Sequence, residues 1–372
     1  MVQYRMARPD EREECIDLAN YAFHLDFEAL MPKAYGKNVV SSAMHMVAVD
    51  EREKLRGQVA IFPELVKVGN SSLKIGYLGT VSVHPRSRGE GHMKVLMDKW
   101  LEELGNNHDM VVLYGQRQRY EYFGFTLGGV KFKYTVTDTN VRHALKHVDG
   151  KGISFRSLFD IEGGEDFAFA INAARSAYVQ RDRQLQPLIL TTLNQKALGV
   201  LENGKLIGYL ITNQEGDDIS EIALENTEDL SRTIKAYLAY SGKERIVIYT
   251  PEYEASLNAV LGSFAEDFVI ENSDMYNILD FANVLEAYLT LKYTTTGLVQ
   301  GQFSAVMNGQ PVTACVDSNG VDVKRTAMPD AIVLSKEEAQ RLLLTQHGRF
   351  MPIPVPAGWF PLPLFWYKVD KF

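Results

Sequence analysis

The chain has 372 residues, 46% of them hydrophobic and 23% charged, and this length suggests two or three domains rather than one core. Its 39 Lys and Arg residues against 47 Asp and Glu residues give a net charge of -8. That balance argues against a nucleic-acid scaffold, because phosphate neutralisation needs clustered basic surface. We therefore expect a folded protein with no nucleic-acid partner and a surface that tolerates cationic partners.

The sequence carries no pattern typical of metal binding, membrane insertion or secretion. Cys15 and Cys315 lie far apart without Cys-x-x-Cys spacing, and no His-Glu-x-x-His motif occurs, so we expect no metal and no disulfide framework. The apolar stretch 350–367 contains five prolines, which would break a spanning helix. Residues 1–11 lack the apolar region of a secretory signal. We expect a cytoplasmic protein without a membrane anchor.

Strands and helices alternate over the first 145 residues. The predicted strands are 2–6, 46–49, 58–62, 73–83 and 110–114, and the predicted helices begin at Asp10 and Met93. Two glycines, Gly76 and Gly79, interrupt the longest strand, and glycine inside a strand often marks a bulge or a close backbone approach. This alternation predicts an α/β domain.

The same order returns more faintly from about residue 153. We expect a helix over 166–178, a hairpin over 197–211 with a type I′ turn at Asn203-Gly204, a strand at 219–224, a helix containing Leu230 to Leu238, and a strand at 245–249. The order predicts a duplicated domain. Where the first copy has a basic, glycine-rich turn, the second has the acidic run 225–229, whose carboxylates would repel a phosphate.

A third unit begins near Met275. The predicted elements are a helix over 281–291, strands at 301–307, 311–316 and 321–323, and a final helix that Ser335 and Glu338 start as a capping box. We therefore divide the chain into three domains at 1–148, 149–274 and 275–372.

A strand feeds the turn 86–91 (Arg-Ser-Arg-Gly-Glu-Gly) into a predicted helix. Free backbone N–H groups, the positive end of the helix dipole and two arginines meet at this point, which favours an anion such as a phosphate. The turn is neither a Rossmann fingerprint, because Lys94 stands where the third glycine belongs, nor a Walker A loop. The alternative is an ordinary turn whose glycines only serve a positive φ.

The pattern Arg86-x-x-Gly89-x-Gly91 after this strand resembles the acetyl-CoA signature of the GCN5-related N-acetyltransferase (GNAT) superfamily, and 5–11 resembles its first strand and helix. The three-part order of the chain resembles the Eis (enhanced intracellular survival) family of this superfamily. The resemblance implies an α/β (α+β) architecture: two GNAT-like domains in tandem with mixed central sheets, the second degenerate, and a C-terminal domain similar to sterol carrier protein 2.

The resemblance also implies acetyl-CoA as cosubstrate. The strand would line the pantetheine, the loop amides would hold the pyrophosphate, and the end of the next strand would face the other side of the cofactor. The residues implied are Val81, Ser82, Val83, Arg86, Arg88, Gly89, Glu90, Gly91, His92, Met93, Lys94, Gly115 and Gln116.

Two catalytic groups are implied by the same resemblance. Residues 120–125 resemble the Tyr-x-x-Phe-Gly motif of the family, which makes Tyr120 the proton donor to the CoA thiolate; a phenol with a pKa of about 10 is protonated at neutral pH. The family uses the carboxylate of a terminal phenylalanine as the base, and this chain ends in Phe372. The alternatives are that Tyr120 is a packed aromatic and that the apolar terminus docks in a core.

For the acceptor site, Asp26 could bind an ammonium group and Phe23 or Phe27 could pack on it; the equal alternative is a helix end followed by a core-facing loop. Lys371, beside the terminal carboxylate, would disfavour a polycation unless its side chain points away. We expect direct acetyl transfer to a cationic, aminoglycoside-like amine. The alternatives are a protein lysine, a small metabolic amine, or a non-catalytic acyl-CoA or lipid-binding protein. The family resemblance implies a homohexamer.

Overall fold

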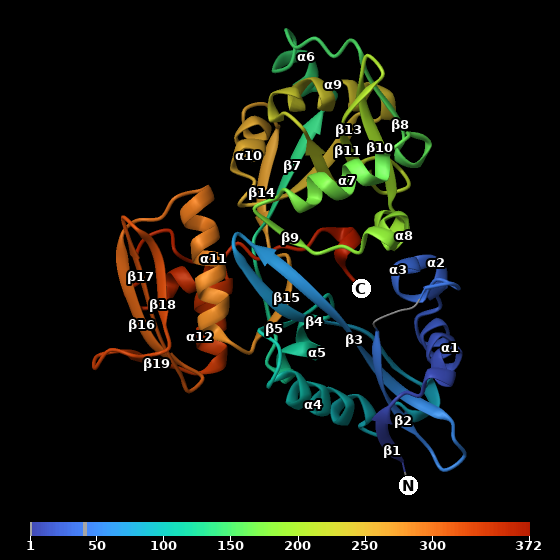
Figure 1. Cartoon of the computed structure of the whole chain (residues 1–372), viewed down its shortest axis with the longest axis vertical. Helices are drawn as coiled ribbons and strands as arrows, with labels where there is room; N and C mark the ends of the chain where they lie inside the picture. The colour runs from blue at the N-terminus through green and yellow to red at the C-terminus, as the bar shows by residue number, and fades with distance from the viewer. Residues whose placement is uncertain (1, 40–42) are drawn as a thin grey trace.

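The computed structural model describes residues 2–39 and 43–372, and in this part of the chain three β-sheets organise three units (Figure 1). The first unit lies at the lower right of Figure 1, the second above it and the third to the left. The expected mixed α/β architecture is confirmed, and each of the three sheets combines antiparallel pairs with one parallel pair.

The first sheet has the order β1-β2-β3-β4-β5-β15-β6, with β9 added along β3. Its strands are β1 (Gln3–Met6), β2 (Met44–Val49), β3 (Leu55–Val68), β4 (Ser71–Val83), β5 (Met110–Leu113), β6 (Thr126–Gly128), β9 (Ala177–Val179) and β15 (Asp274–Ile278). The helices of this unit are α1 (Arg12–Phe23), α2 (Phe27–Leu30), α3 (Pro32–Tyr35), α4 (His92–Leu104) and α5 (Arg117–Tyr120). Strands β4 and β5 run parallel, and α4 connects them. Helix α4 buries its apolar face, including Leu96, Met97 and Trp100, against the sheet.

The second sheet repeats this plan in the order β14-β7-β13-β12-β11-β10-β8. Its strands are β7 (Lys131–Thr137), β8 (Ile153–Ser157), β10 (Lys196–Glu202), β11 (Lys205–Thr212), β12 (Asp218–Leu224), β13 (Arg245–Pro251) and β14 (Asp267–Glu271), and its helices are α6 (Asp138–His143), α7 (Gly164–Ala173), α8 (Gln186–Thr191), α9 (Leu230–Ser241) and α10 (Ala255–Gly262). The parallel pair here is β12 and β13, connected by α9, which matches the pair β4 and β5 around α4. The duplicated order is therefore consistent with two related domains in tandem.

The third unit is a four-stranded sheet in the order β18-β17-β16-β19 with two helices. Its elements are α11 (Phe281–Thr295), β16 (Gly301–Met307), β17 (Gln310–Asp317), β18 (Gly320–Lys324), β19 (Ile332–Leu334) and α12 (Lys336–Leu344). The predicted capping box is present, because the Ser335 hydroxyl accepts from the Glu338 backbone N–H and the Glu338 side chain accepts from the Ser335 N–H. Likeness of this unit to sterol carrier protein 2 stays a prediction.

The sheets do not follow the expected divisions at 148 and 274. Strand β7 precedes residue 148 but belongs to the second sheet, and β15, at the start of the expected third domain, joins the first sheet between β5 and β6. Strand β9 also crosses from the second unit to pair with β3. Strand pairing depends on which hydrogen-bonding edge is free, and hydrophobic patterning does not encode that choice for distant segments.

The proline-rich C-terminal segment is a buried tail that ends between the first and second units, where Figure 1 marks the C-terminus. It runs without regular secondary structure apart from short single turns, and its aromatic residues Trp359 and Trp366 are at most 2% exposed. The backbone N–H of Val130 donates to the carbonyl of Leu364 at 3.0 Å, which ties the tail to the segment joining the two units. The tail therefore carries its last residues into the centre of the molecule.

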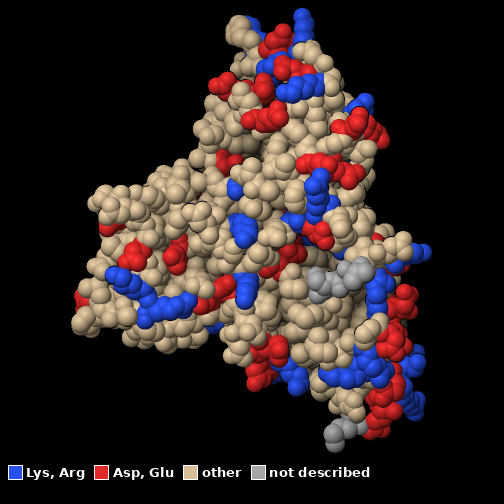
Figure 2. Space-filling model, viewed as in Figure 1, with Lys and Arg blue, Asp and Glu red and all other residues tan. Residues whose placement is uncertain are grey.

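Acidic and basic side chains are interspersed over the face shown in Figure 2, where the third unit is mostly tan. On that face, the part of the chain that the structure describes forms no broad basic patch. Among residues 2–39 and 43–372, no helix is long and apolar enough to cross a membrane.

Candidate active site

Strand β4 carries a bulge near its C-terminal end. The register between β3 and β4 shifts there, so that Thr80 and Val81 together face one residue of β3. Thr80 has a φ of 50°, a left-handed conformation that costs a β-branched residue energy, and its hydroxyl shares a 2.7 Å hydrogen bond with Tyr35. A bulge leaves backbone groups out of the ladder. The bulge expected from Gly76 and Gly79 is present, one residue beyond Gly79.

The glycine-rich turn after β4 leads through a short 3-10 turn (Pro85–Ser87) into α4. Gly89 and Gly91 have φ values of 87° and 81°, and a Cβ at either position would contact nothing within 4 Å. These glycines therefore serve the backbone conformation rather than close packing. Gly91 is the N-cap of α4 and offers no side chain to its first N–H groups, and the first turn has no acidic residue. The N-terminus of α4 is thus open to an anion.

A groove of about 650 Å³ opens along the end of β4 and the start of α4. Nine of the residues implied for acetyl-CoA line it: Val81, Ser82, Val83, Arg88, Gly89, Gly91, His92, Met93 and Lys94. Arg86, Glu90, Gly115 and Gln116 are not part of its wall. The buried His92 ring is hydrogen-bonded on both nitrogens, to Tyr4 at 2.9 Å and to Glu90 at 3.0 Å, so its position is fixed by local contacts.

The three residues expected at the acceptor site do not line one pocket, although the Phe23 and Phe27 rings are 5.4 Å apart between centroids. Phe23, at the end of α1, lines the groove beside β4 instead. Asp26 is exposed and caps α2 by accepting from the Ala29 N–H at 3.1 Å, and Phe27 is 6% exposed in the core. The alternative of a helix end followed by a core-facing loop therefore describes Asp26 and Phe27 better, because α1 stops at Phe23 and a new helix begins.

Tyr120 ends helix α5 and is only 7% exposed. Its ring contacts Phe125 edge-on at 6.2 Å between centroids, and a Cβ on Gly115 would lie 2.4 Å from the ring. Gly115, although not a wall of the groove, therefore makes room for the Tyr120 ring. Burial raises the pKa of Tyr120 above its ordinary value of about 10, so the phenol is protonated at neutral pH.

The last residue of the chain lies against the strand that carries the bulge. The Phe372 ring stacks on Phe62 with centroids 4.1 Å apart, and a Cβ added at Gly79 would lie 3.4 Å from the Phe372 carboxyl carbon. In the described part of the chain, no side chain forms an ion pair with this carboxylate. Lys371 points away and donates to Asp274 at 2.6 Å. The Phe372 carboxyl group therefore lies next to the bulge.

A buried ion cluster holds the tail in this position. Arg181 donates to Asp370 in the tail at 2.8 and 3.0 Å and to Glu221 of β12 at 2.8 Å. Arg175 pairs with Glu221 at 3.2 Å, and the Tyr209 hydroxyl also donates to Glu221. Burial lowers the pKa of Arg181, but the two carboxylates outweigh it and hold the pKa well above its ordinary value. Two cations and two anions thus balance, and the second unit anchors the tail.

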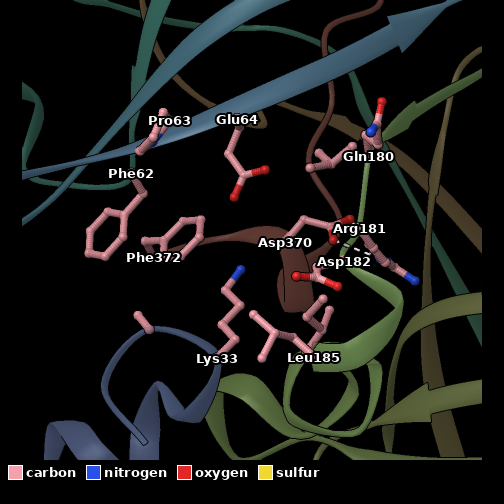
Figure 3. A pocket seen from close by; sticks show the side chains of 13 residues that line it. Lys33, Phe62, Pro63, Glu64, Gln180, Arg181, Asp182, Leu185, Asp370 and Phe372 are labelled. Atoms are coloured by element: carbon pink, nitrogen blue, oxygen red, sulfur yellow. Dashed lines mark hydrogen bonds and ion pairs between the residues drawn. The ribbon is translucent and has the colours of Figure 1, made fainter. Parts of the chain in front are cut away.

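A cavity of about 220 Å³ lies on the far side of the Phe372 ring, between the first and second units (Figure 3). Figure 3 shows Lys33 from α3 and Glu64 from β3 pointing into it from opposite sides. Burial lowers the pKa of Lys33 to about 8 and raises the pKa of Glu64 to about 8. Sequence reasoning missed both residues, because a single lysine after a proline and a glutamate inside a strand carry no pattern of their own.

Residues 3–128 match the family model described as acetyltransferase (GNAT) domain, and the groove, the bulge and Tyr120 all lie within them. Residues 3–128 are therefore an acetyltransferase domain of the GNAT type. No curated protein matches the chain. The described residues contain no group of three or more His, Cys, Asp or Glu side chains placed to hold a metal ion.

Several solved structures share the fold of nearly the whole chain. A GCN5-related N-acetyltransferase from Anabaena variabilis superposes with a TM-score of 0.69 at 15% identity, covering 100% of both chains. A probable N-acyltransferase from Enterococcus faecalis has a TM-score of 0.66 at 18% identity, covering 92% of this chain and 89% of that one. Eis1 from Mycobacterium abscessus has a TM-score of 0.62 at 14% identity with the same coverage. At these identities the likeness concerns the fold.

Proposed function

We propose that the protein transfers the acetyl group of acetyl-CoA to an amine by direct attack on the thioester, and that it is a member of the Eis family. The observation that carries the proposal is the terminal carboxylate of Phe372, which lies against Gly79 of β4, while the Phe372 side chain lines the 220 Å³ cavity. We assign the amine to this cavity and the thioester to the groove along β4.

The proposed reaction assigns one role to each part of the site. The Phe372 carboxylate accepts a proton from the acceptor ammonium, and the amine forms the new C–N bond at the thioester carbon. Backbone N–H groups freed at the Thr80 bulge stabilise the oxyanion. As the C–S bond breaks, the protonated Tyr120 phenol donates its proton to the CoA thiolate, and the second proton lost by the attacking nitrogen restores the phenol through solvent. The open N-terminus of α4 and the basic loop hold the pyrophosphate.

The acceptor that family likeness suggests is a cationic, aminoglycoside-like amine, and the cavity favours a second candidate. Its volume of about 220 Å³ is below the roughly 300 to 1,000 Å³ of pockets that hold drug-sized ligands. Lys33 also places a cation in its wall. We therefore propose a small metabolic amine as the acceptor, with an aminoglycoside as the alternative. By family likeness alone, the same proposal includes a sterol-carrier-like third unit, a homohexamer and a cytoplasmic location.

The variant Tyr120→Phe separates this enzyme from a non-catalytic acyl-CoA-binding protein. We expect kcat for release of free CoA thiol to fall at least about 100-fold, because the thiolate then leaves without its acid. The Kd for acetyl-CoA, measured by calorimetry, stays within error of the native value, since the ring and its packing remain. The matched control Tyr240→Phe removes a hydroxyl from a side chain that is 55% exposed on α9 of the second unit, and it leaves kcat unaltered. An undiminished kcat in Tyr120→Phe contradicts the assigned role.

A further inference from the structure

Lys33 is a buried cation whose positive charge has no carboxylate partner in the described part of the chain. The residue is 7% exposed, and its Nζ donates to the Val369 carbonyl at 2.9 Å. The same Nζ lies 3.6 Å from the centroid of the Phe372 ring. An ammonium group has three N–H donors, and only one of them has a protein acceptor here. The ammonium group points into the cavity (Figure 3), where a donor that the Val369 carbonyl does not use can bind a ligand.

The other cation in the cavity wall cannot bind a ligand in the same way. The Arg181 guanidinium donates hydrogen bonds to Asp370 and Glu221, and Glu221 also pairs with Arg175. This cluster is charge-balanced and almost fully buried. Lys33 is thus the cation of the cavity wall, within the described residues, that is available to an incoming anion.

Two further carboxyl groups line the cavity, those of Glu64 and Asp182; Asp182 is exposed and accepts from the Gln184 backbone N–H at 2.8 Å. No ion pair joins Lys33 and Glu64 in the part of the chain that the structure describes, although both face the cavity (Figure 3). With the pKa of Glu64 raised to about 8 by burial, its carboxyl is largely neutral at pH 7. With the pKa of Lys33 lowered to about 8, its amine is still largely protonated at pH 7. Lys33 therefore places a positive charge in the cavity wall beside the Phe372 ring.

We propose that the acceptor is a small amine that itself carries a carboxylate, such as a free amino acid, and that Lys33 binds this carboxylate while the amine faces the Phe372 carboxylate. One available ammonium suits a monoanion better than a phosphate dianion. The two anchors are close together, because Lys33 contacts the ring of the same residue whose carboxylate serves as the base. The amine and the carboxylate of the acceptor must then be few bonds apart. This inference rests on the proposed function.

The test compares pairs of acceptors, and each pair consists of a free amino acid and the amine that lacks only its carboxylate. The measurement is the release of CoA thiol. In the native enzyme we expect kcat/KM for the amino acid to exceed kcat/KM for the decarboxylated amine at least about 10-fold, because a hydrogen bond between charged groups contributes a free energy of this size. In Lys33→Met, which keeps the apolar stem, KM for the amino acid rises about 10- to 100-fold with little change in kcat. The decarboxylated amine is acetylated by both enzymes at similar rates.

The control variant is Lys336→Met, which removes a second lysine whose pKa burial lowers to about 8 but which lies outside this cavity. It should leave the preference for amino acids intact. A native enzyme that acetylates the decarboxylated amines as well as the amino acids overturns the inference without any variant. An equal loss on both acceptors in Lys33→Met overturns it too, since that indicates a displaced tail. Thiol release that is as fast without an amine as with one overturns the proposed function itself.

Discussion

Removal of Phe372 alone is expected to lower kcat by about 100- to 10,000-fold, the range that a lost general base produces. The shortened chain still ends in a carboxylate, but that group moves back by about 3.5 Å, one residue of extended chain. Displacements of about 1 Å already cost catalysis heavily. Lys371, now terminal, remains held by Asp274 at 2.6 Å, so the new terminus has no route to Gly79.

Two controls make this experiment specific. Phe372→Leu keeps the carboxylate and loses the stacking on Phe62, so it should retain much more kcat than the deletion. The Kd for acetyl-CoA should be unaltered in both variants, because Phe372 does not line the groove along β4. Equal kcat values for the deletion and the native chain would remove the terminal carboxylate from the mechanism and leave the base unassigned.

Asp370→Asn is expected to lower the free energy of unfolding by about 3 to 5 kcal/mol, the usual cost of breaking a buried ion pair from one side. The cluster then holds two arginines against Glu221 alone, in a region where Arg181 is 1% exposed. The measurement is the denaturant midpoint of equilibrium unfolding. The variant should also lose kcat, because the tail that carries Phe372 is no longer fixed to Arg181.

Asp166→Asn is the matched control for stability. It removes the same charge from an exposed pair with Arg183, where the side chains are 60% and 66% exposed, and such pairs contribute little. If the two variants shift the unfolding midpoint equally, the buried cluster does not anchor the tail as described.

Features that depend on neighbouring residues were predictable from the sequence. The turn at Asn203-Gly204 has positive φ at both residues, 49° and 87°, as a type I′ turn requires. The capping box at Ser335 is present, and the glycine-rich turn does lead from a strand into a helix. Each of these is set by the chemistry of three or four successive residues, and therefore leaves a readable pattern.

Features that depend on distant residues left no such pattern. The exchange of β7 and β15 between sheets is decided by free strand edges far along the chain. The cluster of Arg181 with Asp370 joins segments 189 residues apart. Lys33 and Glu64 face the same cavity only because the tail and the first and second units surround it. In the sequence, only the family resemblance indicates a role for Phe372. Its position against Gly79 depends on the course of the whole C-terminal tail, which no local pattern encodes.

We propose that this chain acetylates small amines. The most direct measurement is release of free CoA thiol by the intact protein with acetyl-CoA and a panel of free amino acids, simple amines and aminoglycosides. We expect turnover that depends on the amine and is fastest with small acceptors, in keeping with a cavity of about 220 Å³. Binding of acetyl-CoA without thiol release for any amine would contradict the account and identify an acyl-CoA-binding protein.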